Sequence, residues 1–260
     1  MNNLTIDIYG KCNQDCEFCY QDLDGSMLST EQVLKIVDES KYSETVNIGG
    51  GEPFLHSGIL DIINGIRKRD RKVHIATDAA IIPKGLLELE DRVREGATMQ
   101  VSLHASNPEL FKRITNRNLF DAVIRNTRRL TERYQTLIST AVYQVNYDDV
   151  PNIVDLVVKE LEIPIRVNLV FPEGKGKDVE LLRQDQIDRL RGYLLLQRIK
   201  TNGLVDSPLV HENNCTALES AYGIEKKGLC PVDCGIKRYV SPRGTTHNCE
   251  FLVSGEKNAN

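Results

Sequence analysis

The sequence lacks three features that would each point to a different class of protein. No apolar run approaches the ~20 residues needed to span a bilayer, and the N-terminus MNNLTIDIYGKC has no basic leader or apolar signal core. The formal net charge is -4, which provides no overall attraction for nucleic acid. We therefore expect a cytoplasmic protein with no membrane and no nucleic-acid partner.

The composition fits a globular protein that contains metal. The chain has 260 residues, of which 40% are hydrophobic and 27% charged, enough for one sizeable core and a small appendage. Tryptophan is absent, and the cysteines number seven and fall into two widely separated groups. This pattern is unlike a secreted disulfide framework, so metal binding is the better hypothesis.

Short β-branched runs alternate with stretches of helical period up to about residue 200. The strand candidates are 4–9, 45–48, 72–77, 99–103, 137–145 and 165–171, and the helix candidates are 29–41, 57–69, 84–95, 118–134, 149–162 and 183–199. Repeated βα units of this kind build a parallel sheet. We predict an α/β fold, a partial (β/α)6 TIM-type barrel, with functional residues just after the strands.

The segment after residue 200 has a different character. It contains Gly and Cys with little helical period, and 239–241 and 245–249 are expected to form a hairpin around Pro242, Arg243 and Gly244. We therefore predict two domains, a barrel over residues 1–200 and a small cap over residues 201–260.

The first cysteine group follows the first strand candidate. Cys12, Cys16 and Cys19 form a C-x3-C-x2-C loop at the end of the sheet where ligands bind. Three thiolates can hold three irons of a [4Fe-4S] cluster and leave the fourth iron open to a small molecule. A structural zinc site is the alternative, although zinc usually takes four protein ligands.

This spacing and placement resemble the radical S-adenosylmethionine (SAM) superfamily, and the resemblance covers most of the chain. In that family an aromatic residue before the last cysteine packs near the adenine of SAM, and Phe18 matches it. After the second strand, Gly50, Gly51 and Glu52 resemble the family's GGE motif, which holds the amino group of SAM. Glycines there allow the backbone to approach a ligand closely.

Two further positions are implied by the same resemblance. Ser102 corresponds to a hydroxyl near the SAM ribose, and Asn146 to a polar residue near the ribose or the following helix. The third strand departs from the family, because it ends in Ala-Thr-Asp-Ala where many relatives have Thr-Asn-Gly. His104, Tyr143 and Asp78 also lie at strand ends, but position alone assigns no catalytic role, and the catalytic residues are left open.

The resemblance implies a specific chemistry. A low-potential donor such as ferredoxin or flavodoxin reduces the cluster, SAM is cleaved reductively, and a 5'-deoxyadenosyl radical abstracts hydrogen from a peptide or small-molecule substrate. The protein positions the reactants and excludes water, because the cofactor carries the difficult chemistry.

The second group consists of Cys215, Cys230, Cys234 and Cys249. The spacing from Cys234 through Gly244 to Cys249 is C-x9-G-x4-C, which resembles the start of the motif in SPASM and twitch domains. That resemblance implies one auxiliary [4Fe-4S] cluster, an iron–sulfur cap on the barrel, that aids oxidation or substrate binding. Zinc held by the four cysteines is the alternative.

Two other functions stay open from the sequence. Glycyl-radical enzyme activases also carry C-x3-C-x2-C, although the C-terminal cysteines argue against a minimal activase. A non-enzymatic electron carrier or a zinc-stabilised binding protein would not bind SAM. After the sixth strand candidate, Lys175 or Lys177 can contact an anion, although a solvated loop is the simpler interpretation.

Overall fold

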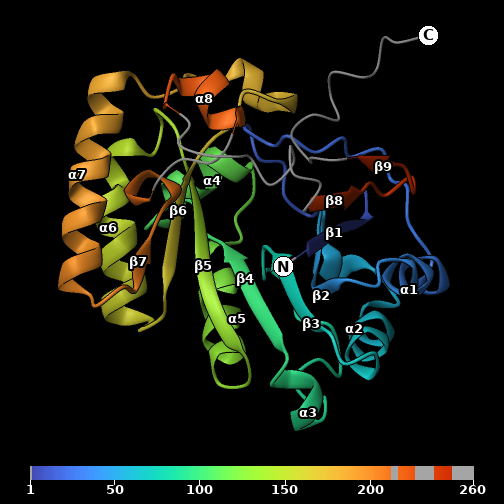
Figure 1. Ribbon diagram of the computed structural model, residues 1–260. Coiled ribbons are helices and arrows are strands. Elements are labelled where there is room, and N and C mark those ends of the chain that lie inside the picture. The colour runs from blue at the N-terminus through green and yellow to red at the C-terminus, as the bar shows by residue number, and fades with distance from the viewer. Residues whose placement is uncertain (1, 212–215, 226–236, 248–260) are drawn as a thin grey trace, which may run out of the picture.

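The computed structural model describes residues 2–211, 216–225 and 237–247, and the strands of these residues form a single sheet (Figure 1). The strands are β1 (Asn2–Tyr9), β2 (Ser43–Gly50), β3 (Lys72–Thr77), β4 (Ala97–Ser102), β5 (Gln135–Val142), β6 (Ile165–Leu169), β7 (Val205–Asp206), β8 (Lys237–Val240) and β9 (Thr246–His247). Their order is β7-β6-β5-β4-β3-β2-β1-β8-β9. All neighbours pair in parallel except β8 and β9.

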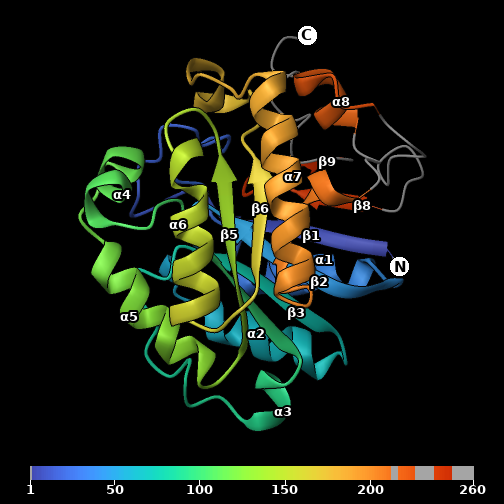
Figure 2. The ribbon, with the colours of Figure 1, turned by 90° about the vertical axis from the view of Figure 1, so that its left-hand side faces the viewer.

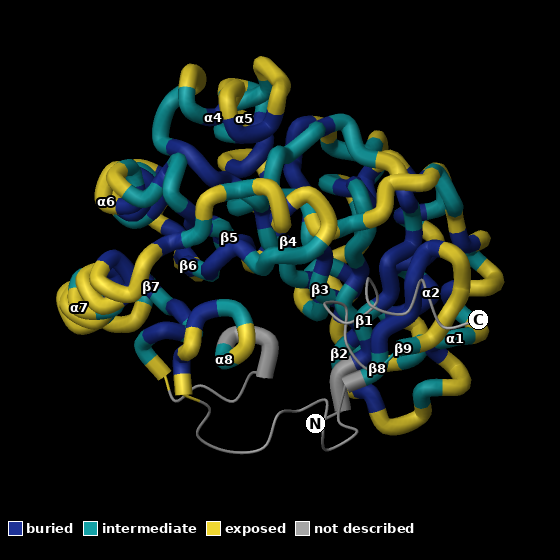
Figure 3. Tube along the Cα trace, turned by 90° about the horizontal axis from the view of Figure 1, so that it is seen from above, coloured by how far each residue is buried: buried dark blue, intermediate teal, exposed yellow. Residues whose placement is uncertain are grey.

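Most of the helices cover one face of this sheet. The helices are α1 (Thr30–Glu39), α2 (Ile59–Lys68), α3 (Asp91–Arg94), α4 (Pro108–Thr115), α5 (Phe120–Thr131), α6 (Val150–Asp155), α7 (Gln184–Lys200) and α8 (Thr216–Tyr222). Seen from above, α1, α2 and α4 to α7 lie around the outside of the strands, whereas α8 lies at the open side of the partial barrel (Figure 3). The architecture is the predicted α/β fold, a partial barrel with an outer layer of helices.

Side chains alternate along the strands between the helix-covered face and the opposite face. On β3 the buried positions are Val73, Ile75 and Thr77, and Val73 and Ile75 belong to the same hydrophobic core as apolar residues of the helices. The opposite face is polar: His74 contacts Gln100 at 3.1 Å. The Asn168 side-chain amide likewise donates to the Ser139 hydroxyl at 3.1 Å. The inner face of the partial barrel therefore carries hydrogen-bonding groups.

The structure confirms all six strand candidates and corrects two helix predictions. Residues 84–95 form a helix only at α3, because Gly85 has φ +89° and the segment before α3 turns repeatedly. Helix α4 had no predicted counterpart; the Asn107 side chain caps it by accepting from the Leu110 N–H at 3.0 Å, and Pro108 follows. The Ser29 side chain caps α1 by accepting from the Gln32 N–H at 3.2 Å.

Segments beyond residue 200 extend the sheet at both ends. Strand β7 pairs with β6, and β8 pairs with β1. The predicted hairpin is confirmed in its described part, where Tyr239 faces His247 across the β8–β9 ladder. The assignment of residues 201–260 to a separate domain stays a prediction. Among the helices of the described segments, none has the length and apolar character required to cross a bilayer.

Candidate active site

The cysteine loop leaves the carboxyl end of β1, on the side toward which the arrowheads of β5 and β6 point in Figure 2. Cys12, Cys16 and Cys19 are partly buried free thiols. Burial is the main cause that raises their pKa values, to about 12 for Cys12, and mutual repulsion of the charged forms adds to it. The three thiols are therefore electrostatic neighbours that need a positive partner to become thiolates.

Backbone hydrogen bonds hold this loop from two sides. The Asp15 and Glu17 N–H groups donate to carbonyl oxygens at the end of α4, each at 3.0 Å. On the other side, the Lys175 N–H donates to the Cys19 carbonyl at 2.9 Å. The loop after β6 therefore lies directly on the cysteine loop, and the conformation of the thiols is fixed by two distant parts of the chain.

The glycine run after β2 packs against the start of the cysteine loop. The Gly51 N–H donates to the Tyr9 carbonyl at 2.8 Å, and the Glu52 N–H donates to the Lys11 carbonyl at 2.7 Å. A Cβ on Gly51 would lie 2.2 Å from the Lys11 carbonyl oxygen. Close approach of two protein segments thus requires glycine here. Gly50 has φ +124°, which also favours glycine.

Glu52 is fully buried, and its carboxylate joins two strands. Oε1 accepts from the Phe54 N–H at 2.8 Å and from the Thr77 hydroxyl at 2.7 Å. Oε2 accepts from the Asp78 N–H at 2.6 Å. The glutamate of the motif predicted to hold the amino group of SAM therefore fixes the end of β3 beside the cysteine loop, and the contact of this motif with SAM stays a prediction.

The Phe18 ring lies against two other aromatic rings. The Phe18 ring meets the His104 ring edge-on at 4.8 Å and the Tyr143 ring at 5.4 Å. The Tyr143 hydroxyl donates to the Glu17 carboxylate, which together with burial raises the pKa of Tyr143. The Phe18 ring thus packs on the ends of β4 and β5, and its predicted place beside adenine stays a prediction.

His104 is neutral at physiological pH, and its tautomer follows from its hydrogen bond. Burial lowers its pKa to about 4. The Ala141 N–H donates to Nδ1 at 3.1 Å, so Nδ1 carries no proton and Nε2 does. His104 therefore presents an N–H donor at the end of β4.

The two residues predicted near the ribose have different surroundings. Ser102 ends β4 and is partly exposed. Asn146 is fully buried: its Nδ2 donates to the His104 and Ala141 carbonyls, both at 2.9 Å, and its Oδ1 accepts from the Tyr143 N–H at 3.0 Å. Asn146 thus connects the ends of β4 and β5 through hydrogen bonds. Contacts of either residue with the ribose stay predictions.

The three thiols suit a cluster better than a single ion. In the described segments no three Cys, His, Asp or Glu side chains converge on one metal position. A [4Fe-4S] cluster does not require such convergence, because each thiolate binds a different iron. The Gln14 N–H already lies 3.4 Å from the Cys12 sulfur, a contact of the kind that stabilises thiolate ligands. The residues present therefore fit a three-thiolate cluster.

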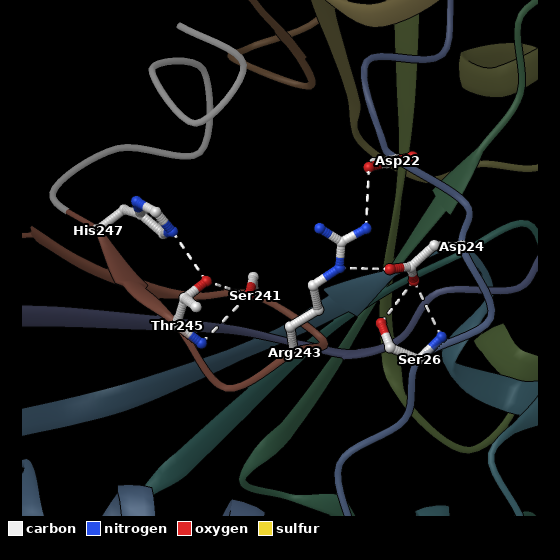
Figure 4. Close-up of polar contacts among 7 residues, drawn as sticks. All are labelled: Asp22, Asp24, Ser26, Ser241, Arg243, Thr245 and His247. Carbon is white, nitrogen blue, oxygen red and sulfur yellow. Dashed lines mark hydrogen bonds and ion pairs between the residues drawn. The ribbon is translucent and has the colours of Figure 1, made fainter. Parts of the chain in front are cut away.

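The C-terminal hairpin contacts the segment that follows the cysteine loop (Figure 4). The Arg243 guanidinium forms ion pairs with Asp22 and Asp24, and Asp24 also accepts from the Ser26 N–H at 2.9 Å. In β8, the Tyr239 hydroxyl donates to the buried Asp7 carboxylate of β1 at 2.7 Å. The hairpin is therefore hydrogen-bonded to the strand that leads into the cysteine loop.

The remaining predicted metal ligands, Cys215, Cys230, Cys234 and Cys249, lie outside the described residues. The two lysines after β6 are described, and both form ion pairs: Lys175 with Asp15, which lowers the pKa of that carboxyl group, and Lys177 with Glu173 at 3.3 Å. Neither contact requires a bound anion.

Comparison with known proteins assigns the family. The model of the radical SAM superfamily matches residues 6–157, which span β1 to α6 and include the cysteine loop and the glycine run. The chain belongs to the radical SAM superfamily. It is thus a member of an enzyme family whose characteristic cofactors are a [4Fe-4S] cluster and SAM, as the cysteine spacing predicts.

Among curated relatives, the GTP 3',8-cyclase of Clostridium perfringens (strain SM101 / Type A) is 26% identical over 199 residues, covering 71% of this chain and 60% of that protein. The mycofactocin maturase MftC of Mycolicibacterium smegmatis is 27% identical over 259 residues, covering 96% and 64%. This radical SAM chain thus spans less than two thirds of the length of either relative.

Solved structures share the fold of this radical SAM chain. Streptococcus suis SuiB bound to its precursor peptide SuiA superposes with a TM-score of 0.79 and 16% identity, covering 99% of this chain and 61% of SuiB. The enzyme anSMEcpe with bound AdoMet and the Cp18Cys peptide has a TM-score of 0.71 and 15% identity, covering 96% and 74%. At these identities the similarity concerns the fold alone.

Proposed function

We propose that this chain binds a [4Fe-4S] cluster through Cys12, Cys16 and Cys19, cleaves SAM reductively, and abstracts hydrogen from a peptide. The observation that carries the proposal is the meeting of three partly buried free thiols with the glycine run at one end of the sheet. When bound, the cluster and SAM supply the radical chemistry. The chain's own residues position these cofactors and exclude water.

The coverage of the relatives favours a peptide over a small molecule. The GTP cyclases match 60–75% of this chain, whereas MftC, named as a maturase, matches 96%. SuiB and anSMEcpe, both solved with bound peptides, match 99% and 96%. The polar inner face of the barrel, with Gln100, Ser139 and Asn168, offers donors and acceptors for peptide groups.

The auxiliary cluster on Cys215, Cys230, Cys234 and Cys249 is part of the same proposal. Its support is the C-x9-G-x4-C spacing and the attachment of the intervening hairpin to β1. An electron donor such as ferredoxin or flavodoxin would reduce the first cluster.

The test is anaerobic reconstitution with iron and sulfide, iron counting, and an assay for 5'-deoxyadenosine with SAM and dithionite. The wild type is compared with a triple Cys12, Cys16, Cys19 to Ala variant. We expect about eight irons in the wild type, and about four with no 5'-deoxyadenosine in the variant. Bound zinc in place of iron and no SAM cleavage by the wild type would refute the proposal.

A second arm tests the substrate class. Peptides encoded beside the gene and GTP are added separately to the reconstituted wild type. A peptide that accelerates 5'-deoxyadenosine formation and changes mass supports peptide modification; acceleration by GTP alone would assign the chain to nucleotide chemistry.

A further inference from the structure

Helices α4 and α5 and the turn between them carry a concentration of positive charge. Residues 108–129 hold six cations against two carboxyl groups, Glu109 and Asp121, in a chain whose formal net charge is -4. All six cations are exposed. We call them the α4–α5 basic patch, and they are Lys112, Arg113, Arg117, Arg125, Arg128 and Arg129.

The cations of this patch are not neutralised by neighbouring carboxylates. None of the six forms an ion pair with a residue that the structure describes. The arginines of α7 differ, because Arg189, Arg191 and Arg198 each pair with an aspartate. A cluster of unpaired cations attracts an anionic partner, and the negative charge of the chain as a whole favours this face for its approach.

The two helices lie side by side in the outer layer of the barrel. The Phe111 ring of α4 meets the Phe120 ring of α5 at 5.8 Å, and both helices lie on the same side of the strands (Figure 3). The 12 residues of α5 extend about 18 Å along the helix. The patch is therefore broad enough for the small interfaces of transient electron-transfer complexes.

The same segment is in direct contact with the cysteine loop. The backbone N–H groups on either side of Cys16 donate to carbonyl oxygens at the end of α4, each at 3.0 Å. In the turn after α4, Arg117 Nε donates to the Asn13 carbonyl at 3.2 Å, and the Asn116 side-chain amide donates to the Asp15 carbonyl at 3.0 Å. A few hydrogen bonds therefore join the surface of the patch to a proposed cluster ligand.

This location suits the entry of an electron. Reductive cleavage of SAM takes up one electron per molecule, and a reduced donor that is itself oxidised has to supply it from outside the protein. Because electron transfer slows steeply with distance, the donor has to dock close to the cysteine loop. The patch meets this requirement on the outer side of the barrel, which leaves the inner face free for SAM and substrate.

We propose that the α4–α5 basic patch is the docking surface for an acidic one-electron carrier protein. This inference rests on the proposed function, and it names the face of the chain that receives the electron. Carboxylates on the carrier pair with the arginines and the lysine of the patch, and the long-range attraction raises the rate of encounter.

The test measures how fast an acidic flavodoxin in its reduced form reduces the reconstituted enzyme, followed anaerobically by the loss of cluster absorbance. The variant Lys112→Glu/Arg129→Glu reverses two charges of the patch. We expect its second-order rate constant at low ionic strength to fall about tenfold or more, and the difference to shrink as salt is added. Reduced methyl viologen, a small cation, should reduce this variant at least as fast as the wild type.

The matched control is Lys41→Glu/Lys68→Glu, which changes the net charge by the same amount. Both lysines are exposed and form no ion pair with a described residue. Lys41 follows α1 and Lys68 ends α2, so both lie at another part of the outer layer. Reduction of this control by flavodoxin should stay within about twofold of the wild type. Thermal unfolding and iron content confirm that each variant is folded and loaded.

The outcomes separate this inference from the proposed function. Equal slowing by both double variants, or no slowing by the patch variant, would overturn the docking assignment while SAM cleavage by the wild type with dithionite still stands. Patch-dependent binding of an acidic peptide or of single-stranded RNA, with unchanged reduction by flavodoxin, would assign the patch to that polyanion instead. A wild type that holds no cluster and forms no 5'-deoxyadenosine with dithionite would overturn the proposed function itself.

Discussion

The hydroxyl of Thr77 donates a 2.7 Å hydrogen bond to the carboxylate of Glu52. This contact joins the last residue of β3 to the segment that follows β2, inside the core and beside the cysteine loop. With the Phe54 and Asp78 N–H groups, it gives the Glu52 carboxylate three donors. The glutamate of the glycine run is therefore a structural connection between two strands.

We expect Glu52→Gln to lower the free energy of unfolding by about 1–3 kcal/mol, because a Gln NH2 group in place of one oxygen would face an N–H donor. Chemical denaturation of the cluster-free protein measures this. The matched control is Glu44→Gln, an exposed glutamate within β2, which should change stability by less than about 0.5 kcal/mol. Equal effects of the two substitutions would contradict the assigned contacts.

Gly51→Ala should destabilise the protein by about 2 kcal/mol or more, because its Cβ would meet the Lys11 backbone at 2.2 Å and this backbone has little room to move. The comparison is Gly192→Ala in the exposed face of α7, where the new Cβ would have no atom within 4 Å apart from its chain neighbours and the backbone of its own helix. That change should stabilise the helix by up to about 1 kcal/mol. Thermal unfolding distinguishes the two, and a tolerated Gly51→Ala would count against the packing described.

His104 makes stability depend on pH. Its pKa is about 4 in the folded protein and about 6.5 when unfolded, so the unfolded chain binds the extra proton between these values. Stability from this group is full above pH 6.5 and is lost as the pH falls toward 4, with about 2 kcal/mol lost between pH 7 and pH 5. His104→Asn should flatten this part of the profile.

Asn is the informative replacement, because its side-chain oxygen can still accept from the Ala141 N–H, the partner of Nδ1. Urea unfolding of both proteins at several pH values provides the comparison. Burial also lowers the pKa of His74. Because His74 is present in the wild type and in the variant, its contribution cancels in the difference between their pH profiles. An unchanged pH slope in the variant would show that another group carries the dependence.

The ion pairs of the hairpin should contribute little to the free energy of unfolding. Arg243 is about half exposed, so Arg243→Ala is expected to cost less than about 1 kcal/mol. Asp24→Ala should cost more, since this carboxylate also accepts from the Ser26 N–H and hydroxyl. Hydrogen bonds from Ser26 are the first cause of its low pKa, about 2. Chemical denaturation measures both variants, and a larger loss of stability for Arg243→Ala than for Asp24→Ala would contradict this ranking.

The sequence predicted those features that follow from local pattern. The bounds of β3 were predicted as found, because the run contains the β-branched residues Val73, Ile75 and Thr77. The meeting of the cysteine loop with the glycine run also followed, since parallel neighbouring strands place their carboxyl ends together. Helix α4 was predictable from its Asn-Pro start but was missed, and the span 84–95 was wrong because Gly85 interrupts the helical period.

Other features depend on contacts between distant residues, which no local pattern reveals. The partners of Tyr143 and Tyr239, Glu17 and Asp7, come from distant parts of the chain. The buried Asn146 amide was predicted as a polar residue near a ligand, but its three hydrogen bonds to the chain become visible only when β4 and β5 are placed.

The place of β8 in the sheet has a consequence for how the protein is made. Strand β1 is synthesised before both of its neighbours, and the second of them, β8, follows β2 to β7 along the chain. Until then one edge of β1 has open hydrogen-bonding groups, and the pairing that closes it is a slow, non-local step. The strand that leads into the cysteine loop therefore gains its second neighbour only after β2 to β7 have been made.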